Sequence, residues 1–146
     1  MKIYLDVCCL NRPFDDQTQD RIHLESEAIL TIMKYVESGM WELINSDVIE
    51  YEINKIPDNE RRNKVSLLIS KANKLRTINT SLISRAKEIQ KFGITSYDAL
   101  HVASAEFEIA DIFLSTDDNL LNKLEKNASK INVKTANPLT WIKEVI

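Results

Sequence analysis

Short, mostly apolar runs alternate with segments of helical periodicity along almost the whole chain. The apolar runs predict strands at 2–9, 41–45, 111–115 and 131–135, because a strand that is buried on both faces of a sheet carries few polar side chains. Strands that alternate with helices are typical of a parallel sheet covered on both faces. We therefore predict an α/β fold, with three α/β/α layers around a central, mainly parallel sheet, formed by residues 1–146 as a single domain.

Between these runs, apolar residues recur at the three- and four-residue spacing of amphipathic helices. The first predicted helix carries Ile22, Ile29, Met33 and Val36 on one stripe and ends at Gly39. Residue types that favour helix caps and breaks set the limits of the others. These predicted helices start at a Ser46 cap and stop at Pro57, span 58–75, run from Thr80 to Phe92, start at a Ser96 cap, span 118–126 and start at Pro138.

Acidic residues occur in four segments where a predicted strand meets a helix. These are Asp6 in KIYLDVCCLN, Glu52 in NSDVIEYEI, Asp98 in TSYDALHVASAE, and Asp117 with Asp118 in FLSTDDNLL. The ends of parallel strands meet at one edge of a sheet, and ligand sites form there. The sequence therefore predicts that these carboxylates come together.

A group of carboxylates without neighbouring bases favours a hard divalent cation. Two carboxylates about 4 Å apart repel by roughly 4 kcal/mol at an effective dielectric constant of about 20, so they must become protonated, separate or bind a cation. Mg²⁺ and Mn²⁺ take oxygen ligands and leave coordination positions for water and phosphate oxygens. The acidic pattern thus indicates phosphodiester chemistry.

The individual acids differ in how strongly they indicate a site. Asp6 interrupts an apolar run, where a carboxylate is costly unless it is paired, protonated or bound to metal. Glu52 falls on the apolar stripe of its predicted helix, whereas Glu50 falls toward the opposite, solvent-facing side. Asp98 stands in a first helical turn, where interaction with the helix dipole is a purely structural alternative.

Several polar residues near these acids are weaker candidates. Ser115 and Thr116 either hydrogen-bond a ligand or cap the following helix. Asn11 either orients a water or phosphate or belongs to a turn. His101 lies one helical turn after Asp98 and is either a partner of a ligand or a half-buried surface residue.

Composition and charge narrow the classes of function. The chain has 44% hydrophobic and 28% charged residues, which is ordinary for a globular protein. A net charge of −3 argues against a protein that coats nucleic acid through many phosphate contacts. A local basic patch is compatible with that charge, and the candidate phosphate contacts are Arg12, Arg61 and Arg62, with a solvated helix face as the alternative.

The few cysteines and histidines give no indication of zinc. Cys8 and Cys9 are adjacent within the first predicted strand, so we expect them to point to opposite sides of the sheet as core residues. His23 and His101 are the only histidines, so a structural zinc site is not expected. The first apolar run is short and contains an Asp, so neither a signal peptide nor a membrane span is expected. We expect a cytoplasmic, reducing environment.

Taken in order, the four acidic segments resemble those of the PIN domain, a small α/β nuclease module found in VapC-type toxins of bacterial toxin–antitoxin systems and in free-standing proteins. IYLDVCCL resembles its first strand, SDVIEYEI its Ser-to-Glu helix, SYDALHVASA its third acidic motif, and LSTDDNLL its Thr-x-Asp segment. The resemblance covers almost the whole chain. It departs from the family pattern after the first Asp, where the family often has Thr or Ser followed by Asn and this chain has Val7 and Cys8.

The resemblance implies a set of metal ligands, namely Asp6, Glu52, Asp98 and Asp118. Thr116 would support the last of these, and the Thr-x-Asp spacing is the reason to prefer Asp118 over Asp117. Ser115 and Asn11 would support the site, with Asn11 replacing the missing polar residues after the first Asp.

The resemblance also implies an activity and partners. A PIN-like protein of this kind would be an endoribonuclease, in which one or two Mg²⁺ or Mn²⁺ ions activate a water for in-line attack on phosphorus. Single-stranded or structured RNA would be the substrate, and a homodimer and an antitoxin protein would be the expected assemblies. One alternative is a non-catalytic module that binds RNA or protein. Another is a phosphatase with Asp6 as nucleophile, although Cys8 stands where an Asp-x-Asp motif needs its second Asp.

Overall fold

The computed structural model of this protein describes residues 1–146, apart from the side chain of Lys74. Its centre is a five-stranded parallel sheet with the order β3-β2-β1-β4-β5. The strands are β1 (Lys2–Leu5), β2 (Glu42–Ser46), β3 (Lys74–Arg76), β4 (Ile112–Leu114) and β5 (Thr135–Ala136). The first strand in the chain is therefore central, and both of its neighbours run parallel to it.

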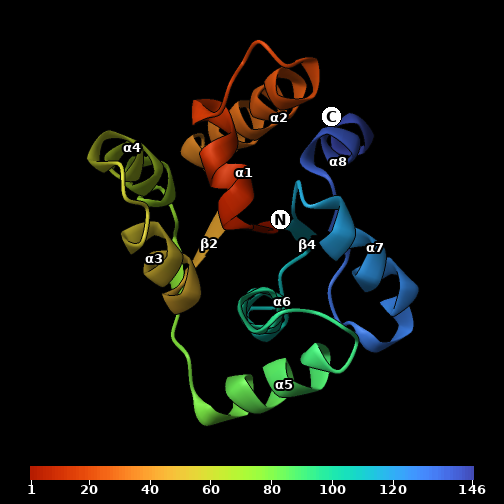
Figure 1. The fold of residues 1–146 in the computed structure, drawn as a ribbon. Helices are drawn as coiled ribbons and strands as arrows, with labels where there is room; N and C mark the ends of the chain where they lie inside the picture. The colour runs from red at the N-terminus through yellow and green to blue at the C-terminus, as the bar shows by residue number, and fades with distance from the viewer.

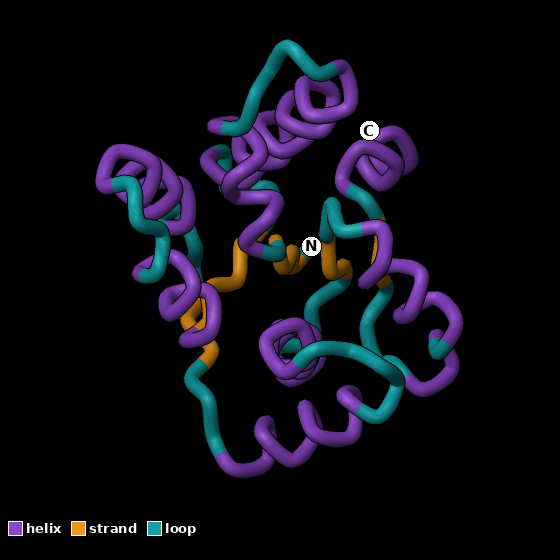
Figure 2. Tube along the Cα trace, viewed as in Figure 1, coloured by secondary structure: helices purple, strands orange, loops and turns teal.

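Helices surround this sheet. They are α1 (Val7–Asn11), α2 (Asp20–Glu37), α3 (Asp47–Asn54), α4 (Asn59–Ile69), α5 (Thr80–Gln90), α6 (Ser96–Phe107), α7 (Asp118–Lys126) and α8 (Pro138–Val145), with 3₁₀ turns at Arg12–Phe14 and Ala128–Lys130. Figure 1 shows α2 and α8 on one side of the sheet and α5 and α6 on the other, and each of these two pairs packs together. Figure 2 shows the strands enclosed between these layers. The predicted three-layer α/β/α fold is confirmed.

The core forms around the two most apolar strands, as their sequence predicts. Ile3, Tyr4 and Leu5 of β1 and Phe113 and Leu114 of β4 have no exposed surface. The rings of Tyr4 and Phe113 stack with their centroids 5.5 Å apart. Full burial of one such side chain contributes about 1.5–3 kcal/mol, so this strand pair anchors the sheet.

Within the described chain, no helix is both long and apolar enough to cross a membrane.

Several helices begin or end close to the predicted cap residues. Ser46 caps α3 by accepting a hydrogen bond from the Ile49 amide, as expected. Gly39 follows α2 and Gly93 follows α5, with φ angles of 80° and 84°, which are the left-handed values that favour glycine after a helix. The predicted caps of α5 and α6 are wrong by one residue, because Asn79 and Thr95 accept the capping hydrogen bonds.

The first predicted strand is too long. It ends at Leu5, and the Asp6 carboxylate accepts a hydrogen bond from the Val7 amide and caps α1. Cys8 and Cys9 therefore lie on a helix rather than on opposite faces of a sheet. The cause is local, because a side chain that satisfies a free backbone amide can start a helix even within an apolar run.

The two outer strands were also predicted incorrectly. The predicted helix 58–75 ends at Ile69, and the chain then turns into β3 beside β2, where the amide of Asn73 bonds the Leu43 carbonyl. Pairing with β2 overrides the helical spacing there. At the other edge, the predicted strand 131–135 is reduced to β5, which pairs with β4 over two residues.

Candidate functional site

Three adjacent strands bring polar residues to one edge of the sheet. Asp6 follows β1, Ser46 ends β2, and Ser115 follows β4. The chain of Asp6 continues the pairing with β4 through a 2.9 Å hydrogen bond from its amide to the Leu114 carbonyl. Because all three strands run parallel, their carboxyl ends meet here, which is where ligand sites form in open α/β sheets.

The Asp6 carboxylate is buried and held by hydrogen bonds. Its Oδ1 accepts a bond of 2.8 Å from the Val7 amide, and its Oδ2 accepts bonds of 3.0 Å from Ser115 Oγ and 3.5 Å from Cys8 Sγ. These donors offset the cost of burying the carboxylate. Ser115 and Cys8 thus provide hydrogen-bond support for Asp6.

Asn11 does not contact Asp6. Its amide nitrogen donates a 3.1 Å hydrogen bond to the Val7 carbonyl, and its side-chain oxygen accepts one of 3.2 Å from Arg61. Asn11 therefore secures α1 in this structure. The proposed replacement of the missing polar residues by Asn11 is not seen in these contacts.

A chain of buried hydrogen bonds leads from β2 to Glu52. Tyr4 OH bonds both Ser46 Oγ and His101 Nδ1 at 2.7 Å, and His101 Nε2 donates to Glu52 Oε1 at 2.9 Å. His101 is 1% exposed, so the expectation of a half-buried surface position is wrong. The network fixes the position of Glu52, whose side chain is 27% exposed.

His101 also lies between two of the predicted ligands. Its Nε2 is 3.8 Å from Asp6 Oδ1 as well as 2.9 Å from Glu52. Burial by itself lowers the pKa of His101, but the hydrogen bond to Glu52 and the negative charges of Asp6 and Glu52 raise it above its usual value. The two carboxylates thus favour the protonated form of the imidazole.

Asp98 stands in the first turn of α6 and belongs to the same electrostatic group. Burial and the charge of Asp6 raise its pKa, against the opposing effects of the Thr95 hydroxyl and His101. A carboxyl whose pKa rises through a neighbouring carboxylate lies in a region of excess negative charge. Asp6 and Glu52 thus both lie close to His101 Nε2, and Asp98 interacts electrostatically with Asp6 and His101.

The two acids before α7 point to different neighbours. Asp117 caps α7, with its Oδ1 accepting from the Leu120 amide at 3.2 Å, and its charge contributes to the raised pKa of Asp98. Both oxygens of Asp118 bond Arg21 at 2.8 Å, which lowers the pKa of Asp118. This arrangement favours Asp117 over Asp118 as the fourth acid of the group.

Thr116 hydrogen-bonds both Cys8 and Arg21. Its amide donates to Cys8 Sγ at 3.4 Å, and its carbonyl accepts from Arg21 Nη2 at 3.2 Å. The Asp117 amide bonds Ser115 Oγ at 3.1 Å. The segment after β4 is thus tied to α1 on one side and to α2 on the other.

The donor types fit Mg²⁺ or Mn²⁺, since such ions prefer carboxylate oxygens. Among the described residues, however, no three Asp, Glu, His or Cys side chains lie close enough to form a metal-binding group. Binding of one ion by Asp6, Glu52 and Asp98 would therefore require their side chains to rotate.

The three candidate phosphate contacts all make contacts within the protein. Arg12 Nε bonds the buried Glu25 at 2.9 Å, and Arg61 bonds Asp15 at 2.8 Å. Arg62 donates to the Ile56 carbonyl at 2.7 Å. These guanidinium groups therefore brace α1, α2 and α4 against one another.

Glu25 is a buried acid that was not among the predicted site residues. It accepts hydrogen bonds from Arg12, Arg21 and Asn137 and is 1% exposed. The sequence could have predicted that Glu25 is buried, because it lies three residues after Ile22 and four before Ile29 on the apolar stripe of α2. An acid on such a stripe indicates a buried ion pair or a site.

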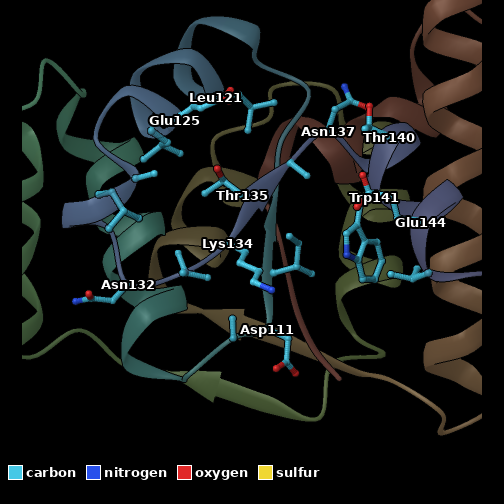
Figure 3. Close-up of a pocket in the computed structure, with 18 of the residues that line it drawn as sticks. Asp111, Leu121, Glu125, Asn132, Lys134, Thr135, Asn137, Thr140, Trp141 and Glu144 are labelled. Atoms are coloured by element: carbon cyan, nitrogen blue, oxygen red, sulfur yellow. The ribbon is translucent and has the colours of Figure 1, made fainter.

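A large groove lies away from Asp6, Glu52 and Asp98. It has a volume of about 1440 Å³ and runs beside β5, between α7 and α8. Figure 3 shows Leu121 and Glu125 of α7 on one side of it and Trp141 and Glu144 of α8 on the other. Asp118 lines this groove, whereas Asp6, Glu52 and Asp98 do not. The candidate site is therefore an open edge of the sheet rather than this groove.

Comparison with known proteins supports the fold. A scan against protein-family models found no match, and a search of curated proteins found no relative. A similar solved structure is a chain in the crystal structure of VapBC2 from Rickettsia felis bound to a DNA fragment from their promoter. It has 14% sequence identity and a TM-score of 0.59, covering 94% of this chain and 98% of that chain. The chain thus has a PIN-like fold.

Proposed function

We propose that this protein is a ribonuclease that uses Mg²⁺ or Mn²⁺ to hydrolyse phosphodiester bonds in RNA. The observation that carries the proposal is that Asp6 and Glu52 both lie close to His101 Nε2 at the carboxyl edge of a PIN-like sheet, with Asp98 interacting electrostatically with Asp6. The fourth ligand would come from the start of α7, and the local contacts favour Asp117 over Asp118.

A bound divalent ion would lower the pKa of a water and stabilise negative charge on the phosphate. The protein would contribute positioning. Ser115 and the Val7 amide hold the Asp6 carboxylate, and the chain through Tyr4 and His101 holds Glu52.

The proposal extends to partners. Similarity of the fold to a chain of the VapBC2 complex supports a role as the toxin of a toxin–antitoxin pair, with an antitoxin protein as the binding partner. A homodimer in the cytoplasm is the proposed working form. These assignments rest on likeness of fold, because the sequence identity is 14%.

The second candidate function is a non-catalytic module that binds RNA or a protein. The observation in its favour is the hydrogen bond that joins Glu52 to His101 and leaves the described carboxylates without a metal-binding geometry. In that case the histidine would be a permanent replacement for a metal ion.

The first experiment is cleavage of labelled single-stranded RNAs by the purified protein in Mg²⁺ or Mn²⁺, with EDTA and Asp98→Asn as controls. Asp58→Asn is a matched variant, because Asp58 caps α4 and Asn caps helices equally well. Cleavage that needs metal, is lost in Asp98→Asn and survives in Asp58→Asn would support the proposal. If no RNA is cut and neither metal raises the melting temperature, the non-catalytic module is favoured.

A further inference from the structure

Two exposed tyrosines stack on each other beside the candidate site. The ring centroids of Tyr51 and Tyr97 are 5.8 Å apart, with 28° between the ring planes. Their exposed fractions are 48% and 41%. One tyrosine belongs to α3 and the other to α6, so the pair bridges two helices at the surface.

Each tyrosine directly precedes an acid of the candidate site. Tyr51 is followed by Glu52 and Tyr97 by Asp98, and α3 packs against α6. Successive residues of a helix project in directions about 100° apart, so each aromatic ring lies on a helix face adjacent to that of its carboxylate. The stacked pair is therefore near the candidate site.

A lysine adds positive charge to the same surface. Lys55 Nζ lies 4.4 Å from the ring centroid of Tyr51 and 5.5 Å from that of Tyr97, and it bonds Tyr97 OH at 3.4 Å. Lys55 contacts aromatic rings, whereas Arg12 and Arg61 pair with carboxylates. The ammonium group is thus placed to meet an anionic ligand.

Burial of apolar surface does not explain the position of the two tyrosines. Aromatic residues at an interior contact stabilise a protein by removing apolar surface from water, and these two rings keep much of their surface exposed. By contrast, Tyr35 and Trp41 form a second aromatic pair, with centroids 4.5 Å apart, in which Trp41 is buried. The exposed pair with its cation has the chemistry of a nucleic-acid platform, because bases stack on aromatic rings and phosphates attract lysine.

We infer that Tyr51 and Tyr97 form a stacking platform for an unpaired RNA base, and that Lys55 binds the phosphate next to that base. The inference rests on the proposed ribonuclease function and gives it a substrate class, namely RNA with an unstacked base beside the cleaved bond. Paired bases cannot stack on the platform because their faces are covered within a duplex.

The test compares alanine and phenylalanine variants of the full chain. Tyr51→Ala and Tyr97→Ala are each expected to raise the KM for a single-stranded RNA by about 10-fold with little change in kcat. Tyr51→Phe and Tyr97→Phe keep the ring and should retain the normal KM. Leu67→Ala is the matched control, since Leu67 on α4 is 65% exposed. Melting temperatures of all variants verify folding.

A second readout follows stacking directly. The same variants are mixed in EDTA with a single-stranded RNA that carries 2-aminopurine, and its fluorescence quenching and anisotropy are measured. Quenching by the wild-type protein that is lost in both alanine variants supports the platform. Lys55→Ala should weaken binding and reduce its dependence on salt, because one phosphate contact is removed.

The outcomes separate this inference from the proposed function. If the wild-type protein cuts RNA and the alanine variants keep its KM and quenching, the platform is wrong and the ribonuclease proposal stands; a protein partner then becomes the occupant to test. If the wild-type protein binds RNA with quenching but does not cut it, the platform stands and the ribonuclease proposal fails. Absence of both binding and cutting overturns both.

Discussion

Two groups of carboxylates in this protein are balanced in different ways. Glu25 on α2 receives Arg12, Arg21 and Asn137. Asp6, Glu52 and Asp98 face one histidine, and the pKa of Asp98 is raised by burial and by Asp6. Guanidinium groups neutralise the negative charge of Glu25. The group of Asp6, Glu52 and Asp98 keeps an excess of negative charge. The difference separates a structural ion-pair network from the group of acids that we propose to bind a cation.

The strongest test of this contrast removes the acid of the balanced region. Glu25→Ala removes the buried partner of Arg12 and Asn137, so we expect a loss of about 3 kcal/mol in the free energy of unfolding, or roughly 6–12 °C in melting temperature. Thermal and urea unfolding measure it. Glu60→Ala is the control, since Glu60 pairs with Lys64 at an exposed position and should change stability by no more than about 0.5 kcal/mol. Equal losses in the two variants would contradict the contrast.

Asp98→Asn should have opposite effects on activity and stability. Loss of a carboxylate ligand is expected to reduce metal-dependent cleavage by at least about 100-fold. In metal-free buffer the same variant should melt about 1–3 °C higher, because repulsion from Asp6 is relieved. Cleavage assays and melting in EDTA provide the two measurements. A lower melting temperature in EDTA would show that Asp98 is structural.

The stability gain of Asp98→Asn should depend on pH in a defined direction. The pKa of Asp98 in the folded protein lies above its usual value of 3.8, so protonation of Asp98 favours folding. That favourable contribution is present below the unfolded pKa and is lost as pH rises through the folded pKa. The difference in melting temperature between the variant and wild type should therefore be larger at neutral pH than at acidic pH.

Tyr4→Phe tests whether the hydrogen-bond chain serves the acid group. The substitution leaves Ser46 and His101 without the hydroxyl that joins them, and it should lower stability by about 1–2 kcal/mol. If the chain positions Glu52, the variant should also bind Mn²⁺ about 10-fold more weakly, as measured by calorimetry. Tyr35→Phe, outside this chain, serves as the control. Unchanged affinity in Tyr4→Phe would limit the chain to a structural role.

The smallest expected difference distinguishes the two acids before α7. Asp117→Asn retains the cap of that helix but removes a charge near Asp98, so we expect cleavage to fall by about 10-fold. Asp118→Asn disrupts an exposed pair with Arg21 and should have a much smaller effect, because exposed pairs contribute little. Parallel cleavage rates of the two variants decide the question. The reverse order would restore Asp118, which the Thr-x-Asp spacing favours.

Periodicity in the sequence predicted the layers and central strands but not their limits. The buried runs of β1, β2 and β4 were readable because they are apolar and bounded by polar residues. By contrast, β3 and β5 span three and two residues, which is too short for any period to be evident. Their existence depends on backbone pairing with β2 and β4, which no local pattern encodes.

The candidate acids were predicted from their own segments for a similar reason, and His101 and Ser115 were named as possible partners, whereas the ion-pair partners from distant segments were not predicted. Asp6 interrupts an apolar run and Glu52 falls on an apolar stripe, so each is unusual within its own segment. The pair of Arg21 with Asp118 joins residues 97 positions apart, and the bond from Asn137 to Glu25 spans 112. Such contacts are set by the packing of α2 against its neighbours, and spacing within a motif cannot reveal them.

The shortness of β3 and β5 affects how copies of the protein can meet. An exposed edge strand offers unpaired amides and carbonyls to which another sheet can attach. Here the two edges of the sheet offer only short stretches of backbone, so neither gives a long template for continuation into a second molecule. The protein is thereby guarded against edge-to-edge aggregation, and an ordered assembly would be built from helix surfaces rather than from an extended sheet.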